Sequence, residues 1–308
     1  MKKRGQPVHG WVILDKPLGK TSAWAVAQVR RTLDAAKAGH AGTLDPLATG
    51  VLPIALGEAT KTVSYVQDGT KGYAFAVRWG EARDTLDAAG AITATSPVRP
   101  TESALRAVLP RFLGRIQQTP PAYSALKVDG QRAYDLARAG APPVLAARTV
   151  QIDTLDLVSA TADDATLQVT CGKGTYVRVL AQDLALALGT LGHVSALRRT
   201  RVGPFHESQA FSMATLGRLV LSPPPLAFLL PVTAALADIP AIAVTGDEAQ
   251  RLKAGQAIRR SSPWVSPGAS PRASLVGHGA ICAMHDGVPV AVAQMQDGEV
   301  RVVRVFNL

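Results

Sequence analysis

Apolar and polar positions in the first third of the chain follow two different periods. Residues 10–17 form a nearly continuous apolar run closed by a Lys-Pro pair, which predicts a short buried strand. Thr21 or Ser22 then caps a helix, whose apolar side chains recur at helical spacing at Val26, Val29 and Leu33. Residues 73–80 instead place a large side chain at every second position, which is the period of a strand with one buried face.

The middle of the chain continues to mix the two periods. Thr101 opens a helix whose pattern contains Pro110, so we expect that helix to kink or to stop early. Residues 120–140 begin extended and end in a helix terminated by Gly140, whereas 166–189 predict a strand, a glycine turn and a helix. Because the elements alternate irregularly and no repeat is visible, we predict an α+β fold around one large mixed, mainly antiparallel sheet.

The predicted secondary structure changes after residues 222–225, a Ser-Pro-Pro-Pro stretch that indicates a linker. Beyond it the pattern predicts a strand and a short helix, a Ser/Pro-rich loop over 261–272, and three short strands. Asp-Gly pairs at 286–287 and 297–298 predict tight turns between those strands. The expected division is a large domain over 1–238 and a small β-rich domain over 239–308.

Charge and cysteine content narrow the class of partner. Lys and Arg number 33 against 23 Asp and Glu, and this net charge of +10 favours nucleic acid without excluding a merely basic protein. Cys171 and Cys282 are far apart and no Cys/His cluster has ligand spacing, so we expect no metal site. Because no stretch resembles a signal peptide or reaches the length of a membrane span, we expect a cytoplasmic protein without a membrane partner.

Residues 39–50, Gly-His-Ala-Gly-Thr-Leu-Asp-Pro-Leu-Ala-Thr-Gly, are the most informative stretch. They present a single carboxylate, Asp45, among glycines, small residues and proline, five positions after His40. Pro46 biases Asp45 toward an extended backbone. Spacing alone leaves two interpretations open: a common Asp-Pro turn, or a loop that presents one catalytic carboxylate at a fixed angle.

Two other stretches combine polar chemistry with turn glycines. Tyr73 follows a Lys-Gly pair at a strand start, and it is either core packing or a ring on which a base stacks. In residues 171–178, two glycines precede Tyr176 and Arg178 at a helix start, where free N–H groups favour anions. Arg178 is either a surface arginine or a residue whose guanidinium binds a carboxylate or a phosphate through two hydrogen bonds.

Two basic clusters complete the candidate chemistry. They comprise Arg198, Arg199 and Arg201 in one stretch, and Arg251, Lys253, Arg259 and Arg260 in the other. Such clusters are either solvated faces or contacts to an RNA backbone, and the net charge of the chain keeps the second interpretation open.

Six of these stretches, in this order, resemble the bacterial tRNA pseudouridine-55 synthases, the TruB family. The match covers most of residues 10–205, and the Asp45 loop and the Pro-Pro-Ala-Tyr-Ser-Ala-Leu-Lys stretch are its specific parts. The six stretches are 10–22, 39–61, 71–80, 118–140, 171–184 and 193–205. Residues 80–90 depart from the family pattern, with Arg83 and Ala89 where a polar residue and an acid are more usual.

The resemblance implies a role for each matching side chain. Asp45 corresponds to the catalytic aspartate, Arg178 to the arginine paired with it, and Tyr73 to the tyrosine that stacks on the target base and is able to carry a proton. The substrate-binding residues that it implies, besides Tyr73, are His40, Tyr176, Leu197 and Lys16.

It also implies a reaction and a partner. A uridine at position 55, in the T-arm loop of tRNA, would become pseudouridine after its nucleotide leaves the stack. The isomerisation adds no atoms and changes no oxidation state, so neither cofactor nor metal is expected, only an ionised carboxylate sealed from bulk water. The expected partner is tRNA, with no obligate protein partner, and residues 239–308 look like a PUA-type RNA-binding domain.

Three rival functions remain to be weighed. A non-enzymatic RNA-binding or RNA-folding module would use the same basic surface, but it does not need the Asp45–Arg178 pair. A synthase that acts within a guide-RNA complex is disfavoured because the sequence lacks long basic tails. A glycoside hydrolase is disfavoured because no second carboxylate in the matching stretches is partnered with Asp45.

Overall fold

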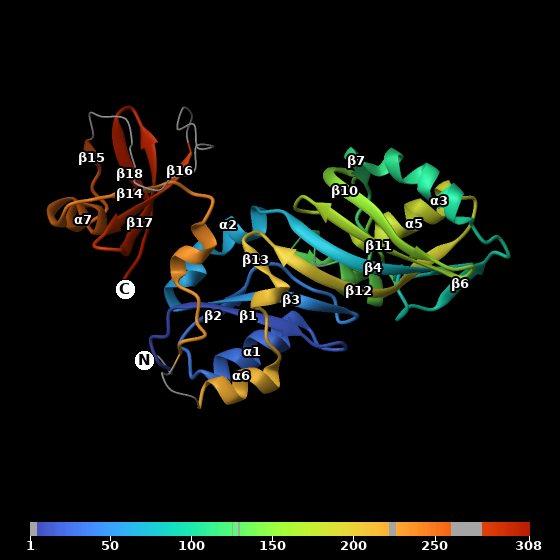
Figure 1. Ribbon diagram of the computed structural model, residues 1–308, viewed down its shortest axis with the longest axis horizontal. Coiled ribbons are helices and arrows are strands. Elements are labelled where there is room, and N and C mark those ends of the chain that lie inside the picture. Colours follow the sequence, from blue (N-terminus) through green and yellow to red (C-terminus); the bar gives the residue numbers. More distant parts are fainter. Residues whose placement is uncertain (1–4, 125, 129, 222–225, 260–278) are drawn as a thin grey trace.

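The computed structural model describes residues 5–124, 126–128, 130–221, 226–259 and 279–308, and these build two main sheets (Figure 1). The larger sheet follows the order β1-β3-β12-β4-β11-β10-β7, with β2 paired to β3 and β13 to β12. Only β3 and β12 run parallel among these described pairs, so the predicted mixed, mainly antiparallel sheet is confirmed. Its strands are β1 (Gly10–Lys16), β2 (Ala38–His40), β3 (Ala48–Leu56), β4 (Lys71–Trp79), β7 (Gly114–Gln118), β10 (Arg148–Ala160), β11 (Asp164–Cys171), β12 (Gly192–Val202) and β13 (Phe205–His206).

The helices begin and end where the sequence provides caps and breakers. Thr21, one of the two predicted caps, accepts a hydrogen bond from the Trp24 amide and starts α1. Helix α3 stops at Val108, and Pro110 lies in the 3-10 turn that follows, as its sequence predicts. The helices are α1 (Ser22–Thr32), α2 (Val63–Asp68), α3 (Glu102–Val108), α4 (Ala133–Arg138), α5 (Val177–Ala187), α6 (Met213–Leu219) and α7 (Gly246–Lys253). The 3-10 turns are η1 (Gly57–Thr62), η2 (Leu109–Phe112), η3 (Glu207–Gln209) and η4 (Val232–Leu236).

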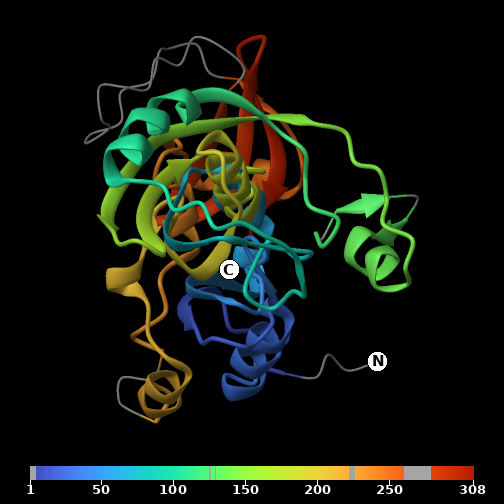
Figure 2. The same ribbon diagram turned by 90° about the vertical axis from the view of Figure 1, so that its right-hand side faces the viewer.

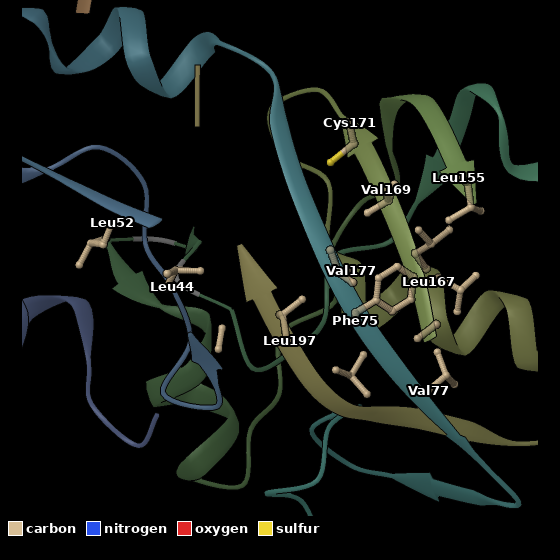
Figure 3. Packing of buried hydrophobic residues seen from close by; sticks show 14 of the residues in the cluster. Leu44, Leu52, Phe75, Val77, Leu155, Leu167, Val169, Cys171, Val177 and Leu197 are labelled. Carbon is tan, nitrogen blue, oxygen red and sulfur yellow. The ribbon is translucent and has the colours of Figure 1, made fainter. Parts of the chain in front are cut away.

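The two periods of the sequence correspond to two kinds of strand. In β1, Val12 and Leu14 join one buried cluster while Trp11 and Ile13 join another, so both faces are covered and the strand is a continuous apolar run. In β4 one face carries the large apolar residues, whereas the other carries Gly72, Ala74, Ala76 and Arg78. Phe75, Val77 and Trp79 belong to the first cluster together with residues of α1 and α5. Figure 3 shows Phe75 and Val77 near Val177 of α5.

The second sheet has five strands in the order β14-β16-β17-β18-β15. Its strands are β14 (Ala241–Ala243), β15 (Ile258–Arg259), β16 (Ala280–His285), β17 (Val288–Gln296) and β18 (Glu299–Val305). Asp286 and Asp297 take positive φ at the tight turns, as their Asp-Gly pairs predict. This sheet packs on the larger one through Cys282, Val292 and Phe306, which share a cluster with Trp11.

Some expectations for the C-terminal part stay predictions. The Ser-Pro-Pro-Pro linker and the Ser/Pro-rich loop at 261–272 lie outside the described residues. The division between 238 and 239 falls between η4 and β14, but packing across it is continuous, so the boundary remains a prediction. Among the described residues, no helix is long and apolar enough to cross a membrane.

Two short hairpins lie beside the larger sheet and complete the surroundings of the site. Strands β5 (Glu81–Arg83) and β6 (Ile92–Thr95) enclose the turn that contains Asp87. Strands β8 (Lys127–Val128) and β9 (Gln131–Arg132) lead into α4, and this segment projects from the body of the protein (Figure 2).

Candidate active site

The Asp45 loop joins β2 to β3 and is fixed from behind by helix α1. Ser22 is buried in the first turn of α1; its hydroxyl donates to the Leu44 carbonyl and accepts from the Leu44 amide, at 3.1 and 2.8 Å. The Ala48 amide donates to the Asp45 carbonyl at 3.0 Å and closes the turn. Both backbone groups of the residue before Asp45 are therefore tied, which restricts the direction in which its carboxylate points.

Arg178 meets this carboxylate from the opposite side of the site. It stands in the first turn of α5, is 5% exposed, and places Nη2 2.9 Å from Oδ2 of Asp45. The same guanidinium donates to the carbonyls of Thr85 and Tyr123 at 2.7 and 2.9 Å. Three separate segments hold it in place, so the predicted pair of acid and arginine is brought together across 133 residues of sequence.

The structure adds a second carboxylate that the sequence interpretation missed. Asp87 is 5% exposed, and its Oδ2 lies 3.6 Å from Nη1 of Arg178. Its Oδ1 accepts from the Thr85 hydroxyl and the Ala89 amide at 2.7 and 3.0 Å. The only signal was an acid within a turn-forming stretch, and that stretch is the one that departs from the family pattern.

A pocket of about 480 Å³ opens on one side of Asp45. Tyr73 from β4 and Leu197 from β12 line it, and Leu197 pairs directly with Phe75 of the buried cluster (Figure 3). Tyr176 lines the far wall at the cap of α5. Burial raises the pKa of both tyrosines, so each phenol is neutral near pH 7. The pocket thus joins a carboxylate, an aromatic ring and an apolar side chain.

A second pocket, of about 440 Å³, lies on the other side of the same carboxylate. His40 lines it from the end of β2, facing Tyr134, Arg132 and Arg138 of the β9–α4 segment. Burial lowers the pKa of His40, and the nearby Arg199 and Arg132 lower it further, so its ring is neutral. The Asp45 side chain is 39% exposed, so it is reachable from these pockets rather than sealed from water as expected.

Lys16, expected among the substrate-binding residues, is fully buried. Its ammonium donates to the carbonyls of Pro17 and Lys20 at 3.0 and 2.6 Å. Burial lowers its pKa to about 8, against an opposing attraction from Asp45. The side chain lines neither pocket, so Lys16 supports the site from within the fold, and its expected contact with substrate stays a prediction.

The basic cluster on β12 is not the exposed patch that the sequence suggested. Arg199 is 2% exposed and donates to backbone carbonyls on the Asp45 loop and β3. Arg198 is paired with Asp15 and Glu207, and Arg201 donates to the Gly203 carbonyl. The strand alternates its side chains between two faces, so adjacent arginines cannot form one surface. In the second cluster Arg259 pairs with Glu299, while Arg260 lies outside the described residues.

Within the described part of the chain, no group of three or more His, Cys, Asp or Glu side chains is placed to hold a metal ion. The site offers an accessible carboxylate paired with a buried guanidinium, two tyrosines and an apolar wall.

Comparisons with known proteins assign the chain to a family. Residues 30–177 match the TruB family pseudouridylate synthase N-terminal domain, and residues 178–237 match the tRNA pseudouridylate synthase B C-terminal domain. The tRNA pseudouridine synthase B of Rhodospirillum rubrum is 51% identical over 308 residues, covering 100% of this chain and 99% of the relative. That of Caulobacter vibrioides is 50% identical over 309 residues, with the same coverage.

Solved structures agree with this fold. A chain of the Cbf5-Nop10-Gar1 complex superposes with a TM-score of 0.74 at 25% identity, covering 97% of this chain and 85% of that one. A chain of an H/ACA RNP bound to a substrate RNA gives 0.72 at 21% identity, covering 100% and 91%, and supports the fold alone. The class that fold and pocket define is that of the pseudouridine synthases, which are isomerases. Within that class, the chain belongs to the TruB family.

Proposed function

We propose that this chain converts uridine 55, in the T-arm loop of tRNA, into pseudouridine, with Asp45 acting on a flipped-out nucleotide. The observation that carries the proposal is the contact of 2.9 Å between Asp45 and Arg178 where two pockets meet. The relatives that cover the whole chain bear the name tRNA pseudouridine synthase B, and the net charge of +10 suits a polyanionic substrate.

The carboxylate supplies the chemistry that breaking the glycosidic bond requires. An ionised acid either stabilises or traps the electron-poor carbon that forms as the N1 bond breaks, as carboxylates do in glycoside hydrolysis. The Arg178 guanidinium pairs with Asp45 and fixes the direction of its carboxylate. Asp87 accepts no substrate proton in this scheme, because it is buried and bonded to its own loop. Attack at the sugar, attack at the base and elimination all remain compatible with this arrangement.

The remaining pocket residues receive the base. Extruding a nucleotide costs a few kcal/mol, and stacking on an aromatic ring returns about 1–3 kcal/mol per base. Tyr73 provides that ring, and its neutral phenol is able to carry the proton that leaves carbon 5. Tyr176 and Leu197 line the pocket that would hold the base. His40 lines the second pocket, beside the part of the tRNA loop that base extrusion would displace.

The C-terminal sheet, assigned here to a PUA-like domain over 239–308, would contact the tRNA outside the target loop. Similarity to Cbf5 chains concerns the fold, and a full-length identity of 51% to tRNA pseudouridine synthase B favours a synthase that works without a guide RNA. An RNA-binding module alone would not need the buried Arg178 aimed at an accessible acid.

The decisive experiment is release of tritium from carbon-5-labelled uridine in tRNA. Asp45→Asn keeps the size of the side chain and removes the charge, so we expect tRNA binding within about threefold of the parent and loss of at least about 10³-fold in turnover. Asp163→Asn is the matched control, since Asp163 is an exposed acid paired with Arg99. Substantial tritium release by the Asp45 variant would remove Asp45 from its role.

A further inference from the structure

We propose that Arg199 is a positioning residue that fixes the Tyr73 phenol and the Asp45 loop relative to each other. The inference rests on the proposed function, because it assigns Tyr73 and Asp45 to the same reaction. Sequence analysis left Arg199 either on a solvated face or in contact with an RNA backbone, whereas the structure buries it and places it in the lining of the first pocket.

Sheet register brings Arg199 to this position. On β12 it pairs directly with Tyr73 of β4, and on the other edge it pairs with Gly50 of β3. Directly paired residues in an antiparallel pair hold their Cβ atoms about 5 Å apart, so the guanidinium and the phenol share one face. A Cβ at Gly50 would lie 2.2 Å from the Arg199 carbonyl, so the glycine permits this close approach of β3.

The guanidinium then ties three pieces of backbone. Nε donates to the Val51 carbonyl at 2.8 Å, Nη2 to the Gly42 carbonyl at 3.0 Å, and Nη1 to the Thr43 carbonyl at 3.3 Å. Two of these acceptors belong to the loop that carries Asp45, and the third, the Val51 carbonyl, lies within β3. One planar fork thus fixes the loop to the sheet.

Tyr73 lies beside the same fork. It is the direct cross-strand partner of Arg199, and both residues line the first pocket together with Asp45. Burial raises the pKa of Tyr73, and the cation opposes that rise. A buried cation bonded mainly to backbone carbonyls is costly to maintain. Arg199 lies between the Asp45 loop and Tyr73, so this buried cation fixes the positions of the two groups relative to each other.

Lysine cannot replace this arrangement. A single ammonium on a flexible stem cannot reach three carbonyls that diverge around a planar fork. In Arg199→Lys the loop would lose at least one tie, and misplacement of a catalytic group by about 1 Å costs roughly 100-fold in rate. Arg198→Lys is the matched control, since Arg198 is its neighbour on β12 and is paired on the other side with Asp15 and Glu207.

The test combines turnover with a direct measurement on Tyr73. We expect Arg199→Lys to lower kcat about 100-fold with KM changed by less than about threefold, while Arg198→Lys stays near the parent. The chain has five tyrosines, so fluorotyrosine labelling gives five ¹⁹F signals, and the one lost in Tyr73→Phe is that of Tyr73. In Arg199→Met its titration midpoint should rise by about one pH unit, because the opposing cation is gone.

The two measurements distinguish a failure of this inference from a failure of the proposed function. The ¹⁹F titration needs no substrate, so it tests the contact even if the parent releases no tritium. An unchanged Tyr73 midpoint in Arg199→Met, or a kcat of Arg199→Lys within threefold of Arg198→Lys, overturns the inference. Should Arg199→Met fail to fold, the same titration in Arg199→Lys decides: an altered Tyr73 signal supports the inference and an unaltered one refutes it.

Discussion

The site has two walls that are built in different ways. The Asp45 wall, residues 41–48, is bonded to helix α1 through Ser22, to the sheet through Arg199 and to α5 through Arg178. The hydrogen bonds described for the α4 wall, residues 126–128 and 130–140, join it to positions nearby in the sequence. Among the hydrogen bonds described for it, the Ala133 amide donates to Leu126 and the Tyr134 amide to Ser124, both close in sequence.

This difference separates two tasks. Chemistry needs a carboxylate held within a fraction of an ångström, and such precision comes from a wall tied to several rigid elements. Recognition of a large flexible substrate needs charge and aromatic surface that can adapt. The α4 wall offers these through Arg132 and Arg138, which stack on the Tyr134 ring at 5.8 and 5.5 Å. We therefore expect changes in the first wall to alter kcat and changes in the second to alter KM.

The largest expected effect is at Arg178, which pairs with Asp45 and also donates to the Tyr123 carbonyl, a few residues before the α4 wall in the sequence. Arg178→Lys keeps the charge but cannot contact Asp45, Asp87 and two carbonyls together, so kcat should fall at least about 100-fold with tRNA affinity nearly unchanged. Tritium release under single-turnover conditions measures the rate. Arg99→Lys, at an exposed ion pair, is the control, and a rate within tenfold of this control would contradict the rigid-wall interpretation.

An intermediate effect is expected in the α4 wall. Replacing both Arg132 and Arg138 by Gln removes two cations that border the second pocket. KM should rise about tenfold, kcat should change by less than about threefold, and the salt dependence of tRNA binding should weaken, because fewer counterions are released. Filter binding at several salt concentrations checks the slope. A change confined to kcat would show that this wall also positions the reacting groups.

Sequence predicted the part of the site in which chemistry and local pattern coincide. Asp45 and Arg178 each stand out in a glycine-bearing loop, and the structure joins them. The sequence did not predict Asp87, because its loop departs from the family pattern and its partner, Arg178, is far away in the sequence. Arg199 was misassigned because three arginines were taken as a cluster. The period of a strand could have corrected this, since Leu197 and Arg199 are two positions apart and share a face.

The burial of Lys16 could not be read from the sequence for a related reason. Nothing in the pattern around a lysine beside a proline at a strand end shows burial, and only the packed structure shows that Lys16 is fully buried, with its ammonium bonded to the Pro17 and Lys20 carbonyls. Burial of an ammonium follows from tertiary contacts that local pattern does not contain. The fold class was easier to predict, because alternation in β4 and the continuous run in β1 follow directly from which faces are covered.

The smallest expected effect concerns the buried support of the Asp45 wall and appears in stability. The pKa of Lys16 is lowered from 10.5 to about 8, so between these values the unfolded chain binds a proton that the folded chain does not. Stability therefore rises with pH across this window, and the parent should gain up to about 3 kcal/mol relative to Lys16→Met. Urea unfolding from pH 7.5 to 10.5 measures that difference, and comparing the two proteins cancels the tyrosines and cysteines that also titrate there. Lys127→Met, in the exposed hairpin of the α4 wall, is the control, and its difference in unfolding free energy from the parent should stay constant with pH. If the Lys16→Met and Lys127→Met differences depended equally on pH, the contrast between a buried and an exposed lysine in the two walls would be wrong.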